Sequence, residues 1–558
     1  MSFLTCLTTR NMTSILILCA TLAGCGGGDY AAPDAGAVPL ITATARAPAT
    51  ASGVAAASLA VATDVATAAD TLQTADAAIA APVVRATSAA VTPAADLAAT
   101  QAAAWPFAPP PLTTLRASPK KVFAHYFTPF PVSIDNKAPE SDYYAVNYLQ
   151  PGGENGKFAG SGGFIKQRPL PRPVIAGADW ARTDAAQDVR RAAALGIDGF
   201  AVDLLATSGT HWARAQQMMD VAASIDSGFK ILLMPDMEAE FKAQPGNVLT
   251  AVRALAAHPA AHRLHDGRLV LAPYNAQNQS VAWWTNLLAT LKAEGIEVAF
   301  FPVFQGWGRF AAAFAPISHG MSDWGDRSPG VNRAWQAAPA QAHGLGMQWM
   351  STVSPQDTRA KDLIYWEARN SENYRVMWES AINGGADWVQ IVTWNDYSES
   401  TEIAPSSGTQ WSFYDLTAYY VAWFKTGVRP PVMRDALMYF HRNQATSAVL
   451  AANKQTRPYS PMRGSDAPAD DIEVLVFATA PATVQVRVGR RLMGSQAVPS
   501  GVTPVRVPLA EGTPAFRLVR DNTTVAAVQS GFPICNTIIY QDLLYRGGSS
   551  LRDLVAPR

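Results

Sequence analysis

Short apolar runs alternate with longer segments of helical periodicity between residues 122 and 424. The runs have the length and β-branched content of buried strands, and apolar residues recur every three to four positions in the segments between them. The predicted strands are residues 122–127, 198–203, 230–235, 269–272, 298–303, 317–322, 347–352 and 388–394. The predicted helices are residues 185–195, 212–223, 248–257, 281–293, 374–382 and 413–424. Repeated strand–helix units of this kind predict an α/β fold, a (β/α)8 TIM barrel over residues 119–428, with a doubly wound open sheet as the alternative.

The chain changes character after the predicted barrel. Residues 429–465 begin with a Pro-rich connection and continue as a helical or irregular stretch. Residues 466–558 then alternate apolar and polar positions in short runs separated by turns, which predicts a small antiparallel β-sandwich. Few aromatic residues lie on these strands, so a structural module packed on the barrel is favoured over a carbohydrate-binding domain.

The N-terminal residues form a predicted export signal. A short apolar run ends in Leu22-Ala23-Gly24-Cys25, which resembles a bacterial lipobox, so residues 1–25 are predicted to be a lipoprotein signal peptide with Cys25 lipidated. The alternative is an ordinary secretory signal. Gly26, and not Asp, follows Cys25, which favours the outer membrane. Residues 26–118 are rich in Ala, Thr and Pro without helical periodicity, which predicts a disordered tether.

Charge, hydropathy and cysteine content exclude several kinds of partner and site. The 558 residues hold 44 Lys+Arg and 44 Asp+Glu, and no basic run is present, so a nucleic-acid partner is not expected. No apolar run reaches the 18 residues of a spanning helix, so the only expected membrane contact is the lipid anchor. After cleavage and lipidation Cys535 is the one remaining cysteine, which excludes an internal disulfide and a cysteine-ligated zinc.

Polar and aromatic residues gather where the predicted strands end, which is where TIM barrels place their chemistry. Carboxylates accept hydrogen bonds from sugar hydroxyls and aromatic faces cover the C–H faces of a sugar ring, so this set suits a polysaccharide. A single Asp after a strand is more often a helix N-cap, but the repetition over several strands favours a cleft. The predicted substrate-binding residues are His125, Tyr126, Asp203, Asp236, Gln305, Asp323, Trp324, Trp394, Asn395 and Tyr397.

The sequence lacks the motifs of dinucleotide-binding, serine-nucleophile and metal-dependent enzymes. No Gly-x-Gly-x-x-Gly follows a strand, no Gly-x-Ser-x-Gly is present, and the eight His are scattered without metal-ligand spacing. Neither a cofactor nor a metal is therefore expected.

The strongest local signal is the pair Asp396 and Glu399 in the loop after the last predicted strand. Glycoside hydrolysis needs two carboxyl groups, one protonated and one ionised. The neighbouring Trp394 and Tyr397 would exclude water and raise one pKa. The alternative is a solvated loop whose Asp caps the next turn.

The segment VQIVTWNDYSES at residues 389–400 resembles the signature of glycoside hydrolase family 71, whose members are mainly α-1,3-glucanases (mutanases). VFAHY at 122–126, GIDGFA at 196–201 and FKILLMPDM at 229–237 resemble its first three strands, so the resemblance covers residues 121–427. It implies a barrel, no metal, and hydrolysis of α-1,3-glucan with inversion. Carried over by position, Asp396 is the general base and Glu399 the general acid, with their carboxyl groups about 6.5–9.5 Å apart.

The chain also departs from that family. Ser398 stands where the family usually has Gly, Thr401-Glu402-Ile403 replaces His-Tyr-Ile, and Asp203 replaces a frequent Asn. These departures make the exact polymer less secure than glycoside hydrolysis. The prediction is an endo-acting, monomeric α-glucan hydrolase; the alternatives are a hydrolase of α-mannan or an exopolysaccharide, or a non-catalytic glycan-binding lipoprotein.

Overall fold

The computed structural model describes residues 104–555. The predicted signal peptide with Cys25, and the predicted tether as far as residue 103, lie outside the described residues. Within the described residues, no helix is both long and apolar enough to cross a bilayer.

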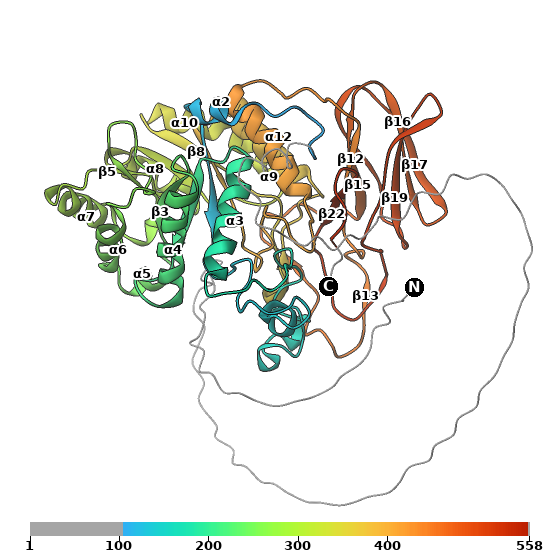
Figure 1. The fold of residues 1–558 in the computed structure, drawn as a ribbon, viewed down its shortest axis with the longest axis horizontal. Helices are drawn as coiled ribbons and strands as arrows, with labels where there is room; N and C mark the ends of the chain where they lie inside the picture. Colours follow the sequence, from blue (N-terminus) through green and yellow to red (C-terminus); the bar gives the residue numbers. More distant parts are fainter. Residues whose placement is uncertain (1–103, 556–558) are drawn as a thin grey trace, which may run out of the picture. The chain divides into compact units, whose positions relative to one another are not determined.

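A nine-stranded parallel sheet forms the first part of the fold (Figure 1). Its strands are β1 (Lys121–Tyr126), β2 (Gly199–Leu204), β3 (Lys230–Pro235), β4 (Leu269–Leu271), β5 (Val298–Phe300), β6 (Val303–Phe304), β7 (Gly320–Asp323), β8 (Gln348–Val353) and β11 (Trp388–Ile391). They follow the order β5-β4-β3-β2-β1-β11-β8-β7-β6. The sheet is curled, because the strands at the two ends of this order are neighbours in the chain.

The predicted strand at residues 298–303 appears as two, β5 and β6. Pro302 lies between them and has no backbone N–H to donate to a neighbouring strand. β5 pairs with β4, and β6 pairs with β7. The other predicted strands lie within three residues of their observed bounds at each end.

The strands bury apolar side chains on both faces, as expected for a parallel sheet covered on both sides. Alternate residues form an inner cluster that includes Phe123, Leu232, Phe301, Met350 and Trp388. The residues between them belong to a larger outer cluster shared with the helices. Because side chains alternate with period two, this division decides which residues point into the curled sheet where each strand ends.

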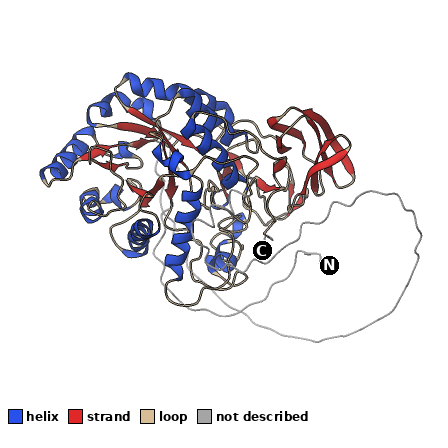
Figure 2. Ribbon diagram, turned by 45° about the horizontal axis from the view of Figure 1, so that its top comes forward, coloured by secondary structure: helices blue, strands red, loops and turns tan. Residues whose placement is uncertain are grey.

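Helices follow most strands and pack on the outer face (Figure 2). The longer ones are α3 (Trp180–Ala194), α4 (Gly209–Ile225), α6 (Asn247–Leu255), α7 (Val281–Ala293), α10 (Ala338–Gly344), α11 (Glu372–Gly384) and α12 (Ser412–Thr426). Shorter elements in the loops include α5 (Glu240–Ala243), α8 (Ala311–Phe314), α9 (Pro329–Asn332), β9 (Thr358–Arg359) and β10 (Ile364–Tyr365). This alternation fits a TIM-like barrel.

The last residues of the predicted tether are part of the fold. Trp105 and Phe107 are buried with their rings stacked, and α2 (Leu112–Ala117) follows them. The indole nitrogen of Trp105 donates a hydrogen bond of 2.9 Å to Asp415 of α12. Residues 104–118 therefore do not belong to a disordered tether, because two aromatic side chains in the Ala- and Pro-rich segment anchor it to the core.

Two four-stranded antiparallel sheets make up the C-terminal part. The first has the order β18-β15-β12-β22 and the second β17-β16-β19-β20. Their strands are β12 (Ala436–His441), β15 (Asp471–Ala478), β16 (Ala482–Val488), β17 (Arg491–Val498), β18 (Gly501–Pro508), β19 (Pro514–Arg520), β20 (Thr523–Gln529) and β22 (Arg546–Ser549). The expectation of a helical or irregular stretch after residue 429 was wrong at β12, which lies in the centre of the first sheet. The apolar–polar alternation predicts strands at residues 473–478, 482–488, 502–508, 515–520 and 524–529, so β17 and β22 were also missed.

The first sheet packs against both its partner sheet and the barrel. Leu437 and Tyr439 contribute to the core between the two sheets. Their neighbour Phe440 faces the other way and meets Phe413 of α12 at 5.1 Å, while Phe477 meets Tyr419 of the same helix at 5.8 Å. The C-terminal sheets thus extend the barrel's hydrophobic core, which favours a structural role.

A buried carboxylate reinforces this contact. Glu473 on β15 is fully buried and accepts hydrogen bonds from Arg506 of β18 at 2.7 and 2.8 Å. It also accepts hydrogen bonds from Ser371, which immediately precedes α11, and from Arg375 of α11 at 3.2 Å. Charged groups from the sandwich and the barrel therefore share one network.

Candidate active site

One row of side chains follows the inner face of the sheet at the carboxyl ends of its strands. Nε2 of His125 lies 3.7 Å from Oδ2 of Asp203 on the next strand. The His125 ring meets Trp324 edge-on at 5.0 Å, and Trp324 meets Tyr274 at 4.6 Å. The amide nitrogen of Gln305 donates a hydrogen bond of 2.6 Å to the Tyr274 hydroxyl. The structure thus brings together four of the predicted binding residues from separate strands, and Trp324 and Gln305 keep partly exposed surface.

The contact between His125 and Asp203 is not an ion pair at neutral pH. Burial lowers the pKa of His125 to about 3, so the imidazole is neutral. Its other nitrogen, Nδ1, lies 3.2 Å from the sulfur of Met234. A neutral imidazole beside a carboxylate offers hydrogen-bonding capacity for a hydroxylated ligand without a net positive charge.

Asp236 lies beyond β3 and is fully buried. One of its oxygens accepts a 2.7 Å hydrogen bond from the backbone of Glu238, so it stabilises the turn after the strand. Asp236 thus has a structural role like that of a helix N-cap, which the sequence analysis gave as the alternative to ligand binding.

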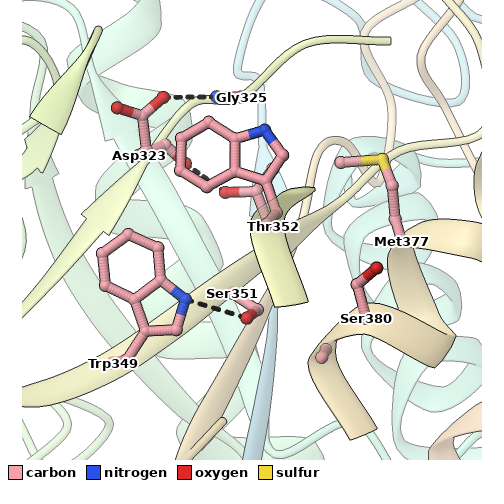
Figure 3. A pocket seen from close by; sticks show the side chains of 9 residues that line it. Asp323, Gly325, Trp349, Ser351, Thr352, Met377 and Ser380 are labelled. Carbon is pink, nitrogen blue, oxygen red and sulfur yellow. Dashed lines mark hydrogen bonds between the residues drawn. The ribbon is translucent and has the colours of Figure 1, made fainter. Parts of the chain in front are cut away.

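Asp323 points away from the inner face, in contrast to the prediction. It precedes the inward-facing Trp324 by one residue, and period two therefore directs it outward. Its carboxylate accepts a 2.8 Å hydrogen bond from the backbone of Gly325, which Figure 3 shows. It accepts a second, of 2.6 Å, from the backbone of Trp307. Burial raises the pKa of Asp323 to about 6. It lines a cavity between β8 and α11 and holds two loops in place, so its position does not support sugar binding.

Tyr126 and Trp394 also lie in the outer core. The Tyr126 ring packs on Phe200 at 5.0 Å, and the fully buried Trp394 ring contacts Phe200 at 5.3 Å and Tyr414 at 6.4 Å. Trp394 thereby packs the loop after β11 against α12, whereas Tyr126 packs β1 against β2. Their placement argues against the predicted contact with substrate.

Asn395 and Tyr397 join the loop after β11 to the loop after β1. The Asn395 side chain accepts a bond from Phe127 N at 2.7 Å and donates to the carbonyls of Phe127 at 3.0 Å and Phe130 at 2.8 Å. Tyr397 is buried with its ring edge-on to Phe130 at 6.1 Å. These residues stabilise the walls around the carboxyl pair.

Asp396 is held rigidly within its own loop. Its backbone N–H donates to Thr393 Oγ1 at 2.7 Å. Its Oδ1 accepts three hydrogen bonds, from the N–H and hydroxyl of Ser398 at 2.8 and 2.7 Å and from the N–H of Glu399 at 3.1 Å. Burial raises the pKa of Asp396, and these bonds oppose the rise because they stabilise the ionised form. The Asp-x-x-Glu spacing therefore folds into a tight turn centred on one carboxylate.

Glu399 has the opposite environment. Its Oε1 lies 3.0 Å from Nη1 of Arg359, while its buried Oε2 has no hydrogen-bond partner among residues 104–555. Burial raises the pKa of Glu399 to about 8, helped by Asp357 and Asp396 and opposed by Arg359 and Arg327. A carboxyl group with this pKa is protonated at neutral pH, and its proton then resides on an oxygen that no protein group occupies.

The loop after β8, which sequence reasoning left without any site residue, supplies the groups around Glu399. Arg359 forms a two-pronged ion pair with Asp357, with Nε–Oδ1 at 2.9 Å and Nη2–Oδ2 at 2.8 Å. The backbone of Thr358 donates a 2.7 Å bond to the Glu399 carbonyl, and the Ser400 hydroxyl returns one of 2.8 Å to the Thr358 carbonyl. The sequence offered only one indication of these residues, namely that an Asp-x-Arg follows the seventh predicted strand.

Both members of the pair are buried, with 4% of Asp396 and 6% of Glu399 exposed. Neither lines the cavity beside β8 that Asp323 and Trp349 share. The described residues also contain no cluster of three or more His, Cys, Asp or Glu that would hold a metal. A carboxyl group with a raised pKa, next to a second carboxyl that accepts three hydrogen bonds, is suited to proton transfer in a nearly dry site.

Hydrolysis of a glycosidic bond requires this combination, and together with the TIM-like fold it indicates a glycoside hydrolase. Comparison with family models makes the class specific: the chain belongs to glycosyl hydrolase family 71, whose model matches residues 174–545. The match contains the carboxyl pair and continues beyond residue 427 through most of the C-terminal sheets. It begins after β1, so the resemblance of that strand lies outside it.

Curated relatives agree with this assignment. The chain is 24% identical over 400 residues to the glucan endo-1,3-alpha-glucosidase agn1 of Schizosaccharomyces pombe, covering 64% of this chain and 90% of that protein. It is 23% identical over 396 residues to a mutanase of Penicillium rubens, covering 67% and 86%. A solved structure of the GH99 endo-alpha-mannosidase from Bacteroides thetaiotaomicron matches 55% of this chain and 97% of its own, with 15% identity and a TM-score of 0.43.

Proposed function

We propose that the protein is an endo-acting hydrolase of α-1,3-glucan that inverts the anomeric carbon, with Glu399 as general acid and Asp396 as general base. The observation that carries this proposal is the asymmetry of the two carboxyl groups. Asp396 accepts three hydrogen bonds on one oxygen, whereas Glu399 has a raised pKa and a free Oε2. The activities named for the fungal relatives support the choice of polymer.

The proposed step consumes one water molecule. Asp396 takes a proton from this water as its oxygen attacks the anomeric carbon. The glycosidic C–O bond breaks, and the leaving oxygen takes the proton of Glu399. The products are two shorter sugar chains, with Glu399 ionised and Asp396 protonated until the protons exchange with solvent.

The row formed by His125, Asp203, Tyr274, Gln305 and Trp324 is proposed to bind the sugar. Neutral imidazole, carboxylate and amide groups match the hydroxyls, and the partly exposed Trp324 ring matches an apolar sugar face. The fold supporting this row is inferred to be a closed (β/α)8 barrel, since β5 and β6 are two halves of one strand position that would complete the ring.

Reducing-end release from insoluble α-1,3-glucan tests the proposal, with α-mannan and β-glucan in parallel. We expect release from α-1,3-glucan and its loss, by about 10²-fold or more, in Glu399→Gln. NMR of the first product should show the β-anomer. Release from α-mannan alone would assign the protein to another polymer, and binding of glucan without release would assign it to capture.

We further propose that the protein is an exported monomer anchored to the outer membrane through Cys25. The support is the lipobox-like sequence at residues 22–25 and the low-complexity segment that follows it. Labelling of cells with radioactive palmitate should mark the wild type and not Cys25→Ser. Equal labelling of both would contradict the anchor.

A further inference from the structure

The Asp357–Arg359 ion pair lies against Glu399 and is not accounted for by the proposed acid and base. Arg359 is 8% exposed and Asp357 is 2% exposed. The two-pronged geometry leaves one guanidinium nitrogen, Nη1, to reach Oε1 of Glu399 at 3.0 Å. The guanidinium is thus fixed by one carboxylate and directed at another.

We propose that Arg359, oriented by Asp357, is a positioning residue that sets the acidity of Glu399 and stabilises the carboxylate left when Glu399 gives up its proton. This inference rests on the proposed function and extends it to two residues of the loop after β8. Arg359 and Asp357 should have opposite effects on the pKa of Glu399, because Arg359 favours the ionised form of Glu399 and Asp357 favours the protonated form.

The physical reason is the loss of water around the general acid. A protonated carboxyl in a dry site is a weak acid, since its conjugate base has nothing to solvate it. Arg359 supplies a fixed positive charge at hydrogen-bond distance, which is worth more where water is excluded. Asp357 neutralises part of that charge, so Glu399 keeps its proton until the leaving oxygen takes it.

The other charges that face Glu399 are few. Asp396 lies in its own loop and favours the protonated form of Glu399, and Arg327, in the loop after β7, favours the ionised form. Arg327 donates to the carbonyls of Trp324 at 2.7 Å and Asp326 at 3.2 Å, so its hydrogen bonds go to its own loop. Arg359, in contrast, forms an ion pair with Glu399 itself, with Nη1 3.0 Å from Oε1.

The test is the pH dependence of kcat and kcat/KM on a soluble α-1,3-glucan oligosaccharide. In Arg359→Met the basic limb should move up by about 1 pH unit or more, and kcat should fall about tenfold, because Glu399 becomes a weaker acid. In Asp357→Asn the same limb should move down. Arg359→Lys, which keeps the charge, should restore part of both effects.

A matched control is Arg520→Met in the sandwich, where Arg520 forms the same kind of two-pronged pair with Asp435 at 2.8 and 2.9 Å. It should leave both limbs unchanged. A basic limb that stays in place in Arg359→Met, or that moves in the same direction in Arg359→Met and Asp357→Asn, would overturn the inference.

A titration that needs no substrate separates this inference from the proposed function. Carbon-13 NMR of glutamate labelled at its carboxyl carbon, with the Glu399 signal assigned from Glu399→Gln, reads the pKa directly. The pKa should rise in Arg359→Met and fall in Asp357→Asn. If the wild type cleaves no α-glucan the proposed function fails, while opposite shifts in this titration would still support the electrostatic roles; an unshifted signal would refute them.

Discussion

Trp105 offers a quantitative test of whether residues 104–118, the N-terminal arm, belong to the folded unit. It is 4% exposed, its ring stacks on Phe107 at 5.6 Å, and its indole nitrogen donates to Asp415 at 2.9 Å. Asp415 is fully buried and also binds Arg552 near the C-terminus at 2.5 and 2.9 Å. Through Asp415 of α12, the Trp105 side chain is therefore linked both to α12 and to Arg552.

Two substitutions divide its contribution into packing and hydrogen bonding. Trp105→Ala removes a buried indole and should lower the free energy of unfolding by about 3–5 kcal/mol. Trp105→Phe keeps most of the ring and removes the donor to a buried carboxylate, so it should cost about 2 kcal/mol. A version of the protein that starts at residue 119 lacks Trp105, Phe107 and α2 and should be less stable than either variant.

Urea unfolding followed by far-ultraviolet circular dichroism measures these differences. Val428→Ala is the control, since Val428 is 67% exposed, and should change stability by less than about 0.5 kcal/mol. If both Trp105 variants matched this control, residues 104–118 would not be part of the folded unit.

Three further substitutions have defined expectations. Burial raises the pKa of Glu402 well above its usual value, so the folded protein keeps this carboxyl protonated and loses stability as pH rises above about 4.5. Glu402→Gln should remove up to about 1.4 kcal/mol of this loss per pH unit, which urea unfolding from pH 5 to 8 would measure. Glu473→Gln removes the buried charge that pairs with Arg375 and Arg506, leaving Arg506 with Glu372, and should cost about 3 kcal/mol in the same assay. Trp324→Ala should raise KM for glucan oligosaccharides three- to tenfold with a smaller change in kcat, because an aromatic face contributes on the order of 1 kcal/mol to binding; equal losses in kcat and kcat/KM would show that Trp324 acts in the transition state instead.

Periodicity predicted the strands and helices well because most of them are short, buried and regular. It failed where a local sequence conflicts with its tertiary setting. β12 lies in a Pro-flanked region and was missed because its partners, β15 and β22, are far along the chain. Trp105 and Phe107 were missed because two aromatics do not make a period, although their burial orders the arm.

The candidate site shows the same limit. Selecting the polar and aromatic residues at the strand ends predicted that His125, Asp203 and Trp324 lie together, which they do, but it also selected Asp323, which period two directs outward. Asp357 and Arg359 escaped because their importance comes from contact with Glu399 on another loop. Sequence pattern locates the edge of the sheet, whereas side-chain direction and contacts between loops require the folded structure.

Leaving-group dependence is the most direct measure of how Glu399 and Asp396 divide the roles of acid and base. A general acid matters only when the leaving oxygen needs a proton. Glu399→Gln should therefore lose about 10²-fold or more on α-1,3-glucan yet hydrolyse a dinitrophenyl α-1,3-glucan oligosaccharide near the wild-type rate, while Asp396→Asn should lose activity on both. Equal losses of Glu399→Gln on the two substrates would contradict its role as the acid.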